Sequence, residues 1–201
     1  MRGSGVHFVI GITGSGKTTY VVDEVIPKLV TETGYPILCI DSEGAGEALI
    51  DGKPNPLTKI PQRPYAESIK AVARDRMHSR FHPENEEQVD AAVHVLHNKR
   101  EGAILFIDEF AYWGNHNRIL PAIERLLRAH RAAKIHLVAT SQYVADVAPL
   151  ALQCTTEATF FKVTGERAKQ NIEQRFAGIS GDEIEKLKRF EKREWNVWGN
   201  P

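Results

Sequence analysis

The sequence has 201 residues, of which 42% are apolar, and its 26 Lys and Arg residues balance 26 Asp and Glu residues. This composition excludes a disordered chain, because enough apolar surface is available for burial and the net charge is zero. Two cysteines without a metal-ligand spacing exclude a disulfide-rich secreted module and a zinc site. No stretch approaches the roughly 20 apolar residues that cross a bilayer. We therefore expect a single cytoplasmic domain over residues 1–201.

Short apolar runs alternate with amphipathic segments along the chain. The sequence predicts buried strands at residues 6–10, 36–40, 103–107, 135–139 and 159–163, with an edge strand at 195–198. It predicts helices at 17–30, which Pro27 kinks or shortens, and at 65–80, 86–98, 118–130, 166–177 and 182–192. Asn85 and Ser180 are the expected caps of two helices, and residues 51–64, with four prolines, form the longest loop. This alternation predicts an α/β fold with a mostly parallel sheet flanked by helices.

The first predicted strand runs into Gly11-Ile-Thr-Gly-Ser-Gly-Lys-Thr18, which fits the phosphate-loop (Walker A) pattern G-x-x-x-x-G-K-[ST]. Its glycines let consecutive backbone N–H groups point into one concavity at a helix N-terminus, which binds a triphosphate. Lys17 is expected to reach the β- and γ-phosphates of ATP, and Thr18 to ligate Mg²⁺. The predicted nucleotide-binding residues are Gly11, Ile12, Thr13, Gly14, Ser15, Gly16, Lys17, Thr18 and Thr19. The alternative, a glycine-rich turn with a chance Lys-Thr pair, does not explain the flanking strand and helix.

Two adjacent carboxylates follow the third predicted strand. The apolar run 104–107 leads into Asp108 and Glu109, the pattern of a Walker B strand. Asp108 is the predicted residue of the Mg²⁺ shell, and Glu109 the predicted base that polarises an attacking water. The plainer alternative is a pair of acids that caps a following helix. Beside the phosphate loop, the pair favours hydrolysis of a nucleoside triphosphate over phosphate transfer to a bound hydroxyl.

The fourth predicted strand ends in Thr140, Ser141 and Gln142. Ligands of parallel sheets lie at the carboxyl ends of strands, so these groups are expected to face the phosphate loop. There Gln142 is predicted to hold a water or to sense the γ-phosphate, unless the three residues only cap the strand.

Arginines recur on the polar side of the helix predicted at 118–130. A motor ring needs an arginine from a neighbouring subunit to neutralise charge on the γ-phosphate. Arg131 is the first candidate for this role in trans and Arg128 the second. The competing interpretation is a solvated helix face.

These motifs together resemble the FtsK/HerA superfamily of DNA-pumping ATPases. The resemblance rests on residues 11–18, 104–109 and 131–142, followed by 160–163, and the genome-packaging ATPases of tailless, membrane-containing icosahedral viruses match best in size. It implies a RecA-like P-loop NTPase core of the ASCE class over about residues 5–165, with a C-terminal extension over about 166–201. It also implies that the fourth strand lies between the phosphate-loop strand and the Walker B strand. The sequence departs from the FtsK pattern at Lys134 and at Ser141.

The resemblance further implies a homo-oligomeric ring, often a hexamer, that threads double-stranded DNA. Translocation on any sequence needs phosphate contacts, which Lys and Arg supply without base readout. The best local patch is residues 53–80, with seven Lys or Arg against two acids. Its alternative is a solvated helix with a loop. The tryptophans at positions 113, 195 and 198 are interpreted as packing or interface residues.

The predicted function is an ATP-driven translocase that packages a viral genome into a preformed capsid. A capsid or membrane vertex protein is the expected partner, and the host cytoplasm, with association at the virion vertex, the expected location. A Zot-like phage assembly or secretion ATPase is an alternative, although Zot-like chains usually carry a membrane segment and none is recognised in this sequence. A nucleoside or nucleotide kinase, and a scaffold that binds ATP only to assemble, are alternatives from other classes.

Overall fold

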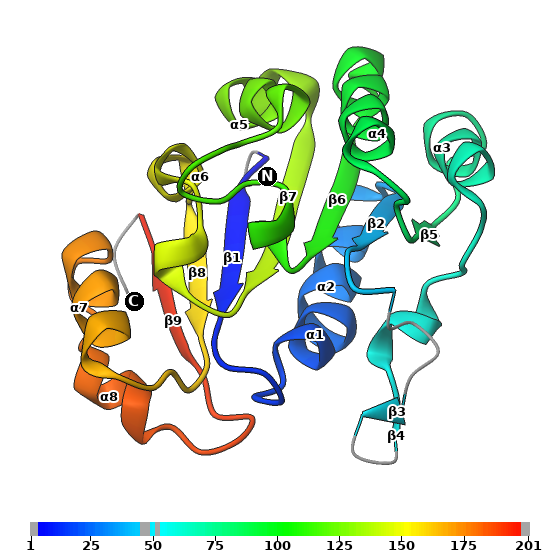
Figure 1. Cartoon of the computed structure of the whole chain (residues 1–201). Helices are drawn as coiled ribbons and strands as arrows, with labels where there is room; N and C mark the ends of the chain where they lie inside the picture. The colour runs from blue at the N-terminus through cyan, green and yellow to red at the C-terminus, as the bar shows by residue number, and fades with distance from the viewer. Residues whose placement is uncertain (1–3, 45–48, 51–52, 198–201) are drawn as a thin grey trace.

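The computed structural model describes residues 4–44, 49–50 and 53–197 and contains one seven-stranded sheet with helices on both faces (Figure 1). The strand order is β5-β2-β6-β7-β1-β8-β9, and every neighbouring pair is parallel except β8 and β9. The strands are β1 (Val6–Ile10), β2 (Ile37–Asp41), β5 (Ser79–Phe81), β6 (Ala103–Asp108), β7 (Ile135–Ser141), β8 (Glu157–Phe160) and β9 (Arg193–Asn196). The predicted single-domain α/β class is therefore confirmed, as is the position of β7 between β1 and β6.

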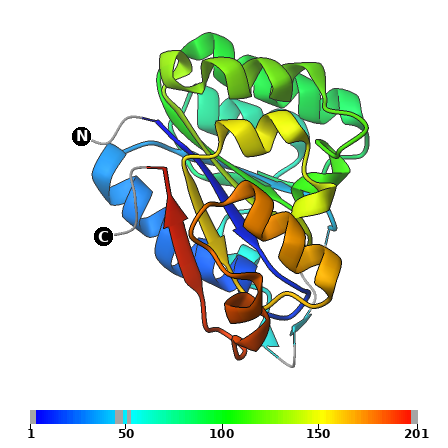
Figure 2. The same cartoon turned by 90° about the vertical axis from the view of Figure 1, so that its left-hand side faces the viewer.

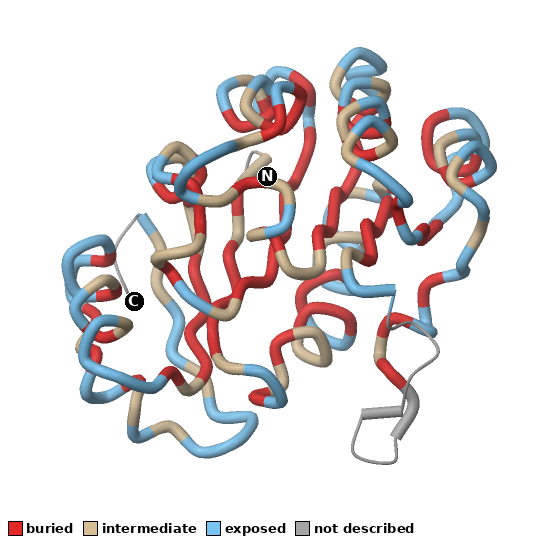
Figure 3. The backbone as a smooth tube through the Cα atoms, in the orientation of Figure 1, coloured by how far each residue is buried: buried red, intermediate tan, exposed pale blue. Residues whose placement is uncertain are grey.

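The helices form two layers, because side chains of a buried strand alternate between the faces of the sheet. Along β6, Ile104 and Phe106 pack in the cluster under α1 (Lys17–Tyr20) and α2 (Ile26–Thr33), whereas Leu105 and Ile107 pack on the opposite side. That side carries α3 (Tyr65–Ala73), α4 (Glu86–Lys99), α5 (Pro121–Ala133), α6 (Pro149–Cys154), α7 (Glu166–Arg175) and α8 (Gly181–Lys186). Figure 2 shows α2 and α5 to α7 on opposite sides of the sheet, and Figure 3 shows the buried residues along the strands.

The strand register brings the carboxyl ends of the central strands together. Ile10 lies opposite Ser141 in β1 and β7, and Asp41 lies opposite Asp108 in β2 and β6. Because each of these strands ends at the same edge, the residues that follow them share one crevice. None of the helices in the described part of the chain combines the length and apolar character needed to cross a bilayer.

The helix after the phosphate loop differs from the prediction. Pro27 does not shorten it, because a π-helical turn at Val21–Val25 joins α1 to α2 and the helix continues to Thr33, where Gly34 caps it. A proline inside a helix lacks an N–H and crowds the carbonyl four residues earlier. The wider π-helical turn lies where that carbonyl would be crowded, so it accommodates the ring without a break.

The predicted helix at 65–80 is wrong in its second half. The helix α3 ends at Ala73, and residues 79–81 form the parallel edge strand β5. The buried guanidinium of Arg80 pairs with the Asp41 carboxylate at 3.2 Å, and this contact is available only when the segment lies beside β2. A long-range ion pair and strand pairing therefore override the local helical preference.

Several predicted boundaries shift as well. The fourth strand extends to Ser141, the fifth begins at Glu157 and ends at Phe160, and the long helix begins at Pro121, at a position where proline fits. Asn85 caps α4 through its side chain, as predicted, whereas the Ser180 side chain makes no cap. The loop at 51–64 contains strand β4 (Lys53–Pro54), paired with β3 (Leu49–Ile50), and a 3₁₀ turn at Pro56–Lys59. The final strand is β9, and Trp198 lies outside the described residues.

Candidate functional site

The phosphate loop leaves the carboxyl end of β1 and opens α1 at Lys17. Gly14 and Gly16 have φ values of 75° and 107°, which glycine adopts without steric cost. The buried ammonium of Lys17 donates to the carbonyl oxygens of Gly11, at 2.6 Å, and Ile12, at 3.1 Å. Burial lowers the pKa of Lys17, against the opposing attraction of Glu109 and Asp108. The side chain therefore folds back onto the backbone of the phosphate loop.

Asp108 ends β6 beside the start of α1. The hydroxyl of Thr18 donates to its Oδ1 at 3.1 Å, and the hydroxyl of Thr140 donates to the same atom at 2.8 Å. Burial raises the pKa of Asp108, and these two hydrogen bonds oppose that change. A hydroxyl and a carboxylate side by side are oxygen ligands of the kind that Mg²⁺ takes, so Thr18 and Asp108 fit a magnesium ion.

At Glu109 the backbone leaves the extended conformation of strand β6. Its backbone has φ 56° and ψ 78°, a left-handed conformation that is uncommon for a residue other than glycine. The Glu109 N–H donates to the Thr140 hydroxyl at 2.8 Å, and the Ser141 hydroxyl donates to the Glu109 carboxylate at 3.4 Å. Non-glycine residues in this conformation concentrate at functional sites. Thr140 thus holds both acids, a link between β6 and β7 that the sequence order does not show.

The Glu109 carboxylate can exchange a proton near neutral pH. Burial raises its pKa from an ordinary 4.5 to about 7, against the attraction of Lys17. The backbone N–H of Gln142 also donates to this carboxylate and favours its ionised form. Gln142 itself is half-buried directly after β7, so the structure brings it to the same crevice.

Within one chain, Arg128 and Arg131 lie away from this crevice. Both lie near the end of α5, which leads into the amino end of β7, at the edge of the sheet away from the phosphate loop (Figure 1). Arg128 pairs with Glu124 one turn earlier on the helix, at 2.9 Å. A role of either arginine in a neighbouring subunit stays a prediction.

The basic segment 53–80 is not a single free positive patch. Arg80 is buried against Asp41, and the guanidinium groups of Arg63 and Arg76 donate to backbone carbonyls. Lys59 pairs with Asp23 at 2.6 Å. The structure does not describe the side chain of Lys53. Lys70 and Arg74, one turn apart on and directly after α3, are exposed. The accessible positive charge is therefore smaller than the sequence count indicates.

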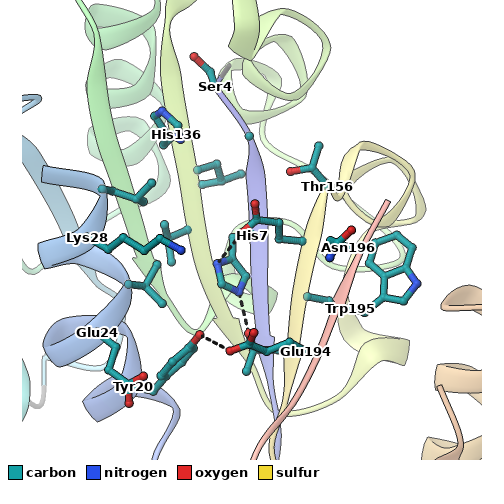
Figure 4. Close-up of a pocket in the computed structure, with 18 of the residues that line it drawn as sticks. Ser4, His7, Tyr20, Glu24, Lys28, His136, Thr156, Glu194, Trp195 and Asn196 are labelled. Atoms are coloured by element: carbon teal, nitrogen blue, oxygen red, sulfur yellow. Dashed lines mark hydrogen bonds and ion pairs between the residues drawn. The ribbon is translucent and has the colours of Figure 1, made fainter. Parts of the chain in front are cut away.

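A cavity of about 830 Å³ lies between the β1–β8–β9 part of the sheet and the α1–α2 helix (Figure 4). The sequence analysis did not predict this cavity. Burial lowers the pKa of His7 in its wall to about 4, and His7 Nε2 lies 2.9 Å from the Thr159 hydroxyl. The Tyr20 hydroxyl donates to Glu194 at 3.3 Å near its lower end. The cavity thus combines polar and apolar side chains, and none of residues 11–18 lines it.

The family model of the Zonular occludens toxin (Zot) matches residues 5–159. The chain belongs to the Zot family. The match includes the phosphate loop, the pair Asp108 and Glu109 and the end of β7, so the family and the fold together make this chain a P-loop ATPase. A comparison with curated protein sequences finds no match.

Among solved structures, the genome packaging NTPase B204 from Sulfolobus turreted icosahedral virus 2, in complex with ATP-gammaS, is similar over 98% of this chain and 94% of that chain. Its TM-score is 0.77 at 18% identity. The bacterial conjugative coupling protein TrwBdeltaN70 has a TM-score of 0.62 at 12% identity, over 96% of this chain and 82% of that chain. The cytoplasmic domain of the Thermomonospora curvata type VII secretion ATPase EccC has a TM-score of 0.60 at 10% identity, over 96% and 22%. These likenesses confirm the predicted α/β fold with a mostly parallel sheet.

Proposed function

We propose that this P-loop ATPase is a motor that hydrolyses ATP in an oligomeric ring and moves double-stranded DNA into a preformed viral capsid. The observation that carries the proposal is Glu109, a half-buried carboxylate with a pKa raised to about 7, held beside the phosphate loop by Thr140 and Ser141. A base of this pKa suits proton abstraction from water. The likeness to B204, a genome packaging NTPase, over nearly the whole of both chains supports packaging over other motor tasks.

The phosphate loop would bind ATP mainly through backbone N–H groups of residues 11–19. The Lys17 ammonium would exchange its bonds to the Gly11 and Ile12 carbonyls for phosphate oxygens. Thr18 and Asp108 would hold Mg²⁺, which when bound neutralises charge on the β- and γ-phosphate oxygens.

Glu109 would accept a proton from the water that attacks the γ-phosphate. Gln142, directly after β7, would orient that water or sense the γ-phosphate. Arg131, or Arg128, would approach from a neighbouring subunit, because both are too far along the sheet to act within their own chain. The ring is therefore a requirement of the proposed mechanism, and a hexamer is the expected assembly.

Duplex DNA would be held through its phosphates, independently of base sequence. Lys70 and Arg74 are exposed, and neither forms a salt bridge with another described side chain, so they are the best candidates within residues 53–80. The partner at the capsid, a capsid or membrane vertex protein, belongs to the same proposal.

The test is ATP hydrolysis measured while duplex DNA is titrated, first at low salt and then at increasing salt concentrations. The proposal predicts stimulation by duplex DNA of any sequence, lost progressively as salt is raised. Removing both charges in Lys70→Ala with Arg74→Ala should weaken DNA stimulation without changing basal turnover. The matched control removes Arg167 and Arg175, two exposed charges on α7. No stimulation by duplex DNA, with basal hydrolysis intact, would contradict translocation.

The family match favours a second candidate, a Zot-like assembly or secretion ATPase that moves protein or single-stranded DNA. Stimulation by single-stranded and not by duplex DNA in the same assay would support it. Transfer of phosphate to nucleosides would instead support a kinase, and nucleotide-dependent assembly with negligible turnover would support a scaffold. Counting subunits in the presence of a nonhydrolysable ATP analogue tests the ring directly.

A further inference from the structure

A tight turn after α8 presents an exposed aromatic ring. The Glu191 N–H donates to the Lys188 carbonyl at 3.1 Å, and the Lys188 N–H donates to the Glu191 carboxylate at 2.8 Å. Phe190, at the third position of this turn, has φ 68°, where glycine or asparagine is the usual residue. It is 56% exposed to solvent. A bulky apolar residue in a strained, exposed position is not explained by packing in the core.

This turn lies directly on the phosphate loop. The Phe190 N–H donates to the Ser15 carbonyl at 3.2 Å. A Cβ atom added to Gly16 would lie 2.4 Å from Phe190 Cδ1 and 2.9 Å from Cε1, so one edge of the ring touches the loop backbone. Only a glycine at position 16 allows this approach. The aromatic ring is therefore a part of the wall beside the nucleotide loop.

The segment that follows is tied to the helix that the phosphate loop opens. The Lys192 ammonium pairs with Glu24 at 2.6 Å and lies 3.8 Å from the centroid of the Tyr20 ring. The Tyr20 hydroxyl also points toward Glu194 in β9 and donates to it (Figure 4). These contacts fix the position of Phe190 relative to the loop. The Arg189 guanidinium lies 4.9 Å from the Phe190 ring centroid and supports the ring.

The order of the strands in the sheet indicates which end of a bound nucleotide would reach the Phe190 ring. Asp108 and Glu109 end β6, on one side of β1, so the reacting γ-phosphate has to lie on that side. The other end of the nucleotide then extends toward β8 and β9, on the opposite side of β1. Phe190 lies there, three residues before β9. An aromatic ring at that place is suited to stack on a base.

We propose that Phe190 is the platform on which the base of the bound nucleoside triphosphate stacks. The proposal rests on the proposed function, because it needs a nucleotide in the phosphate loop. Every base has an aromatic face, so a stacking ring contributes affinity without selecting among bases. The ligand class is therefore any nucleoside triphosphate, and the triphosphate part is recognised independently by the loop.

The test is titration calorimetry with Mg-ATP, Mg-GTP and inorganic tripolyphosphate as three probes. Phe190→Ala should raise the Kd of ATP and of GTP by about tenfold and leave the Kd of tripolyphosphate unchanged. Phe190→Tyr, which retains a ring, should bind both nucleotides within about twofold of wild type. Met77→Ala removes another side chain that is 51% exposed, on the loop between α3 and β5, and is the control expected to change nothing.

The outcomes separate the platform from the motor. An unchanged Kd of ATP in Phe190→Ala would overturn the platform and leave the motor standing. An equal weakening of tripolyphosphate would also overturn it, because the ring would then act only through the shape of the loop. A weakening confined to the nucleotides, in a protein that does not hydrolyse ATP, would support the platform and contradict the motor. Absence of ATP binding by the folded wild type would contradict both.

Discussion

Replacing Glu109 with glutamine removes the proposed base while retaining the size and most hydrogen bonds of the side chain. General-base catalysis contributes about 10²- to 10⁴-fold to a rate. We therefore expect kcat for ATP hydrolysis to fall by at least about 100-fold in Glu109→Gln. The affinity for ATP should stay within a fewfold, because Lys17 and the loop backbone bind the phosphates. The wild-type rate should rise with pH through about 7, where half of the Glu109 carboxylates are ionised, and level off above it.

The same substitution has a predicted effect on stability. Burial raises the pKa of Glu109 from an ordinary 4.5 to about 7. A tenfold change in proton affinity corresponds to about 1.4 kcal/mol, so holding the ionised carboxylate in the folded chain costs about 3 kcal/mol. Because the folded pKa lies above the unfolded one, the stability that this group contributes is present below pH 4.5 and is lost as the pH rises to about 7. Glu109→Gln has no ionisable group at this position, so its free energy of unfolding should not fall over that pH range for this reason.

Urea unfolding of both proteins at pH 5.5 and pH 8, without nucleotide, measures this difference. The account predicts that Glu109→Gln gains about 2 kcal/mol over wild type between the two pH values. Glu109→Asp, which retains the charge on a shorter chain, is the matched control and should follow wild type. A Glu109→Gln protein with at least a tenth of the wild-type kcat would refute the catalytic reasoning, and parallel pH profiles would refute the burial reasoning.

Three further substitutions test contacts around the site. Thr140→Val leaves a backbone N–H and a carboxylate without their shared hydroxyl, which should cost about 1–3 kcal/mol in urea unfolding and lower kcat; Thr140→Ser should restore both, and a fully active valine variant would contradict the link. Arg80→Ala leaves Asp41 buried without its partner, so we expect a loss of about 3–5 kcal/mol, largely recovered when Asp41→Asn is added; an unchanged midpoint would show that the pair is dispensable. Asn85→Ala removes a helix cap worth about 1 kcal/mol, seen as a Tm lower by about 2–4 °C, whereas Asn85→Asp should melt like wild type; equal melting of the alanine variant would argue against the cap.

The phosphate loop and the acidic pair could be located from the sequence because their signals are local. The glycines of residues 11–16 and the Lys-Thr pair that follows indicate a phosphate loop only when a strand precedes them and a helix follows. The hydrophobic pattern predicts both of these elements. The apolar run before Asp108 likewise marks a buried strand that ends in an acid. The parallel sheet followed from the alternation of such strands with helices, because parallel strands need crossover connections.

What the sequence did not predict depends on contacts between distant residues. The ion pair between Arg80 and Asp41 in β2 stabilises strand β5 beside β2. No pattern within residues 65–80 indicates that pair. The Ser180 side chain makes no cap hydrogen bond, and at this helix start the Gly181 N–H bonds to Glu173 in α7. The Phe190 turn had no local signal either, since a phenylalanine occupies a position where glycine is usual. Such features need the tertiary structure, since their stabilising partners lie far away along the chain.

Titration calorimetry of Mg-ATP into the folded protein tests the central claim most directly. The account predicts saturable uptake of one nucleotide per chain, weakened at least tenfold in Lys17→Ala, because that ammonium lies against the backbone of the phosphate loop. Folded wild-type protein that takes up no nucleoside triphosphate with magnesium present would contradict the account at its base.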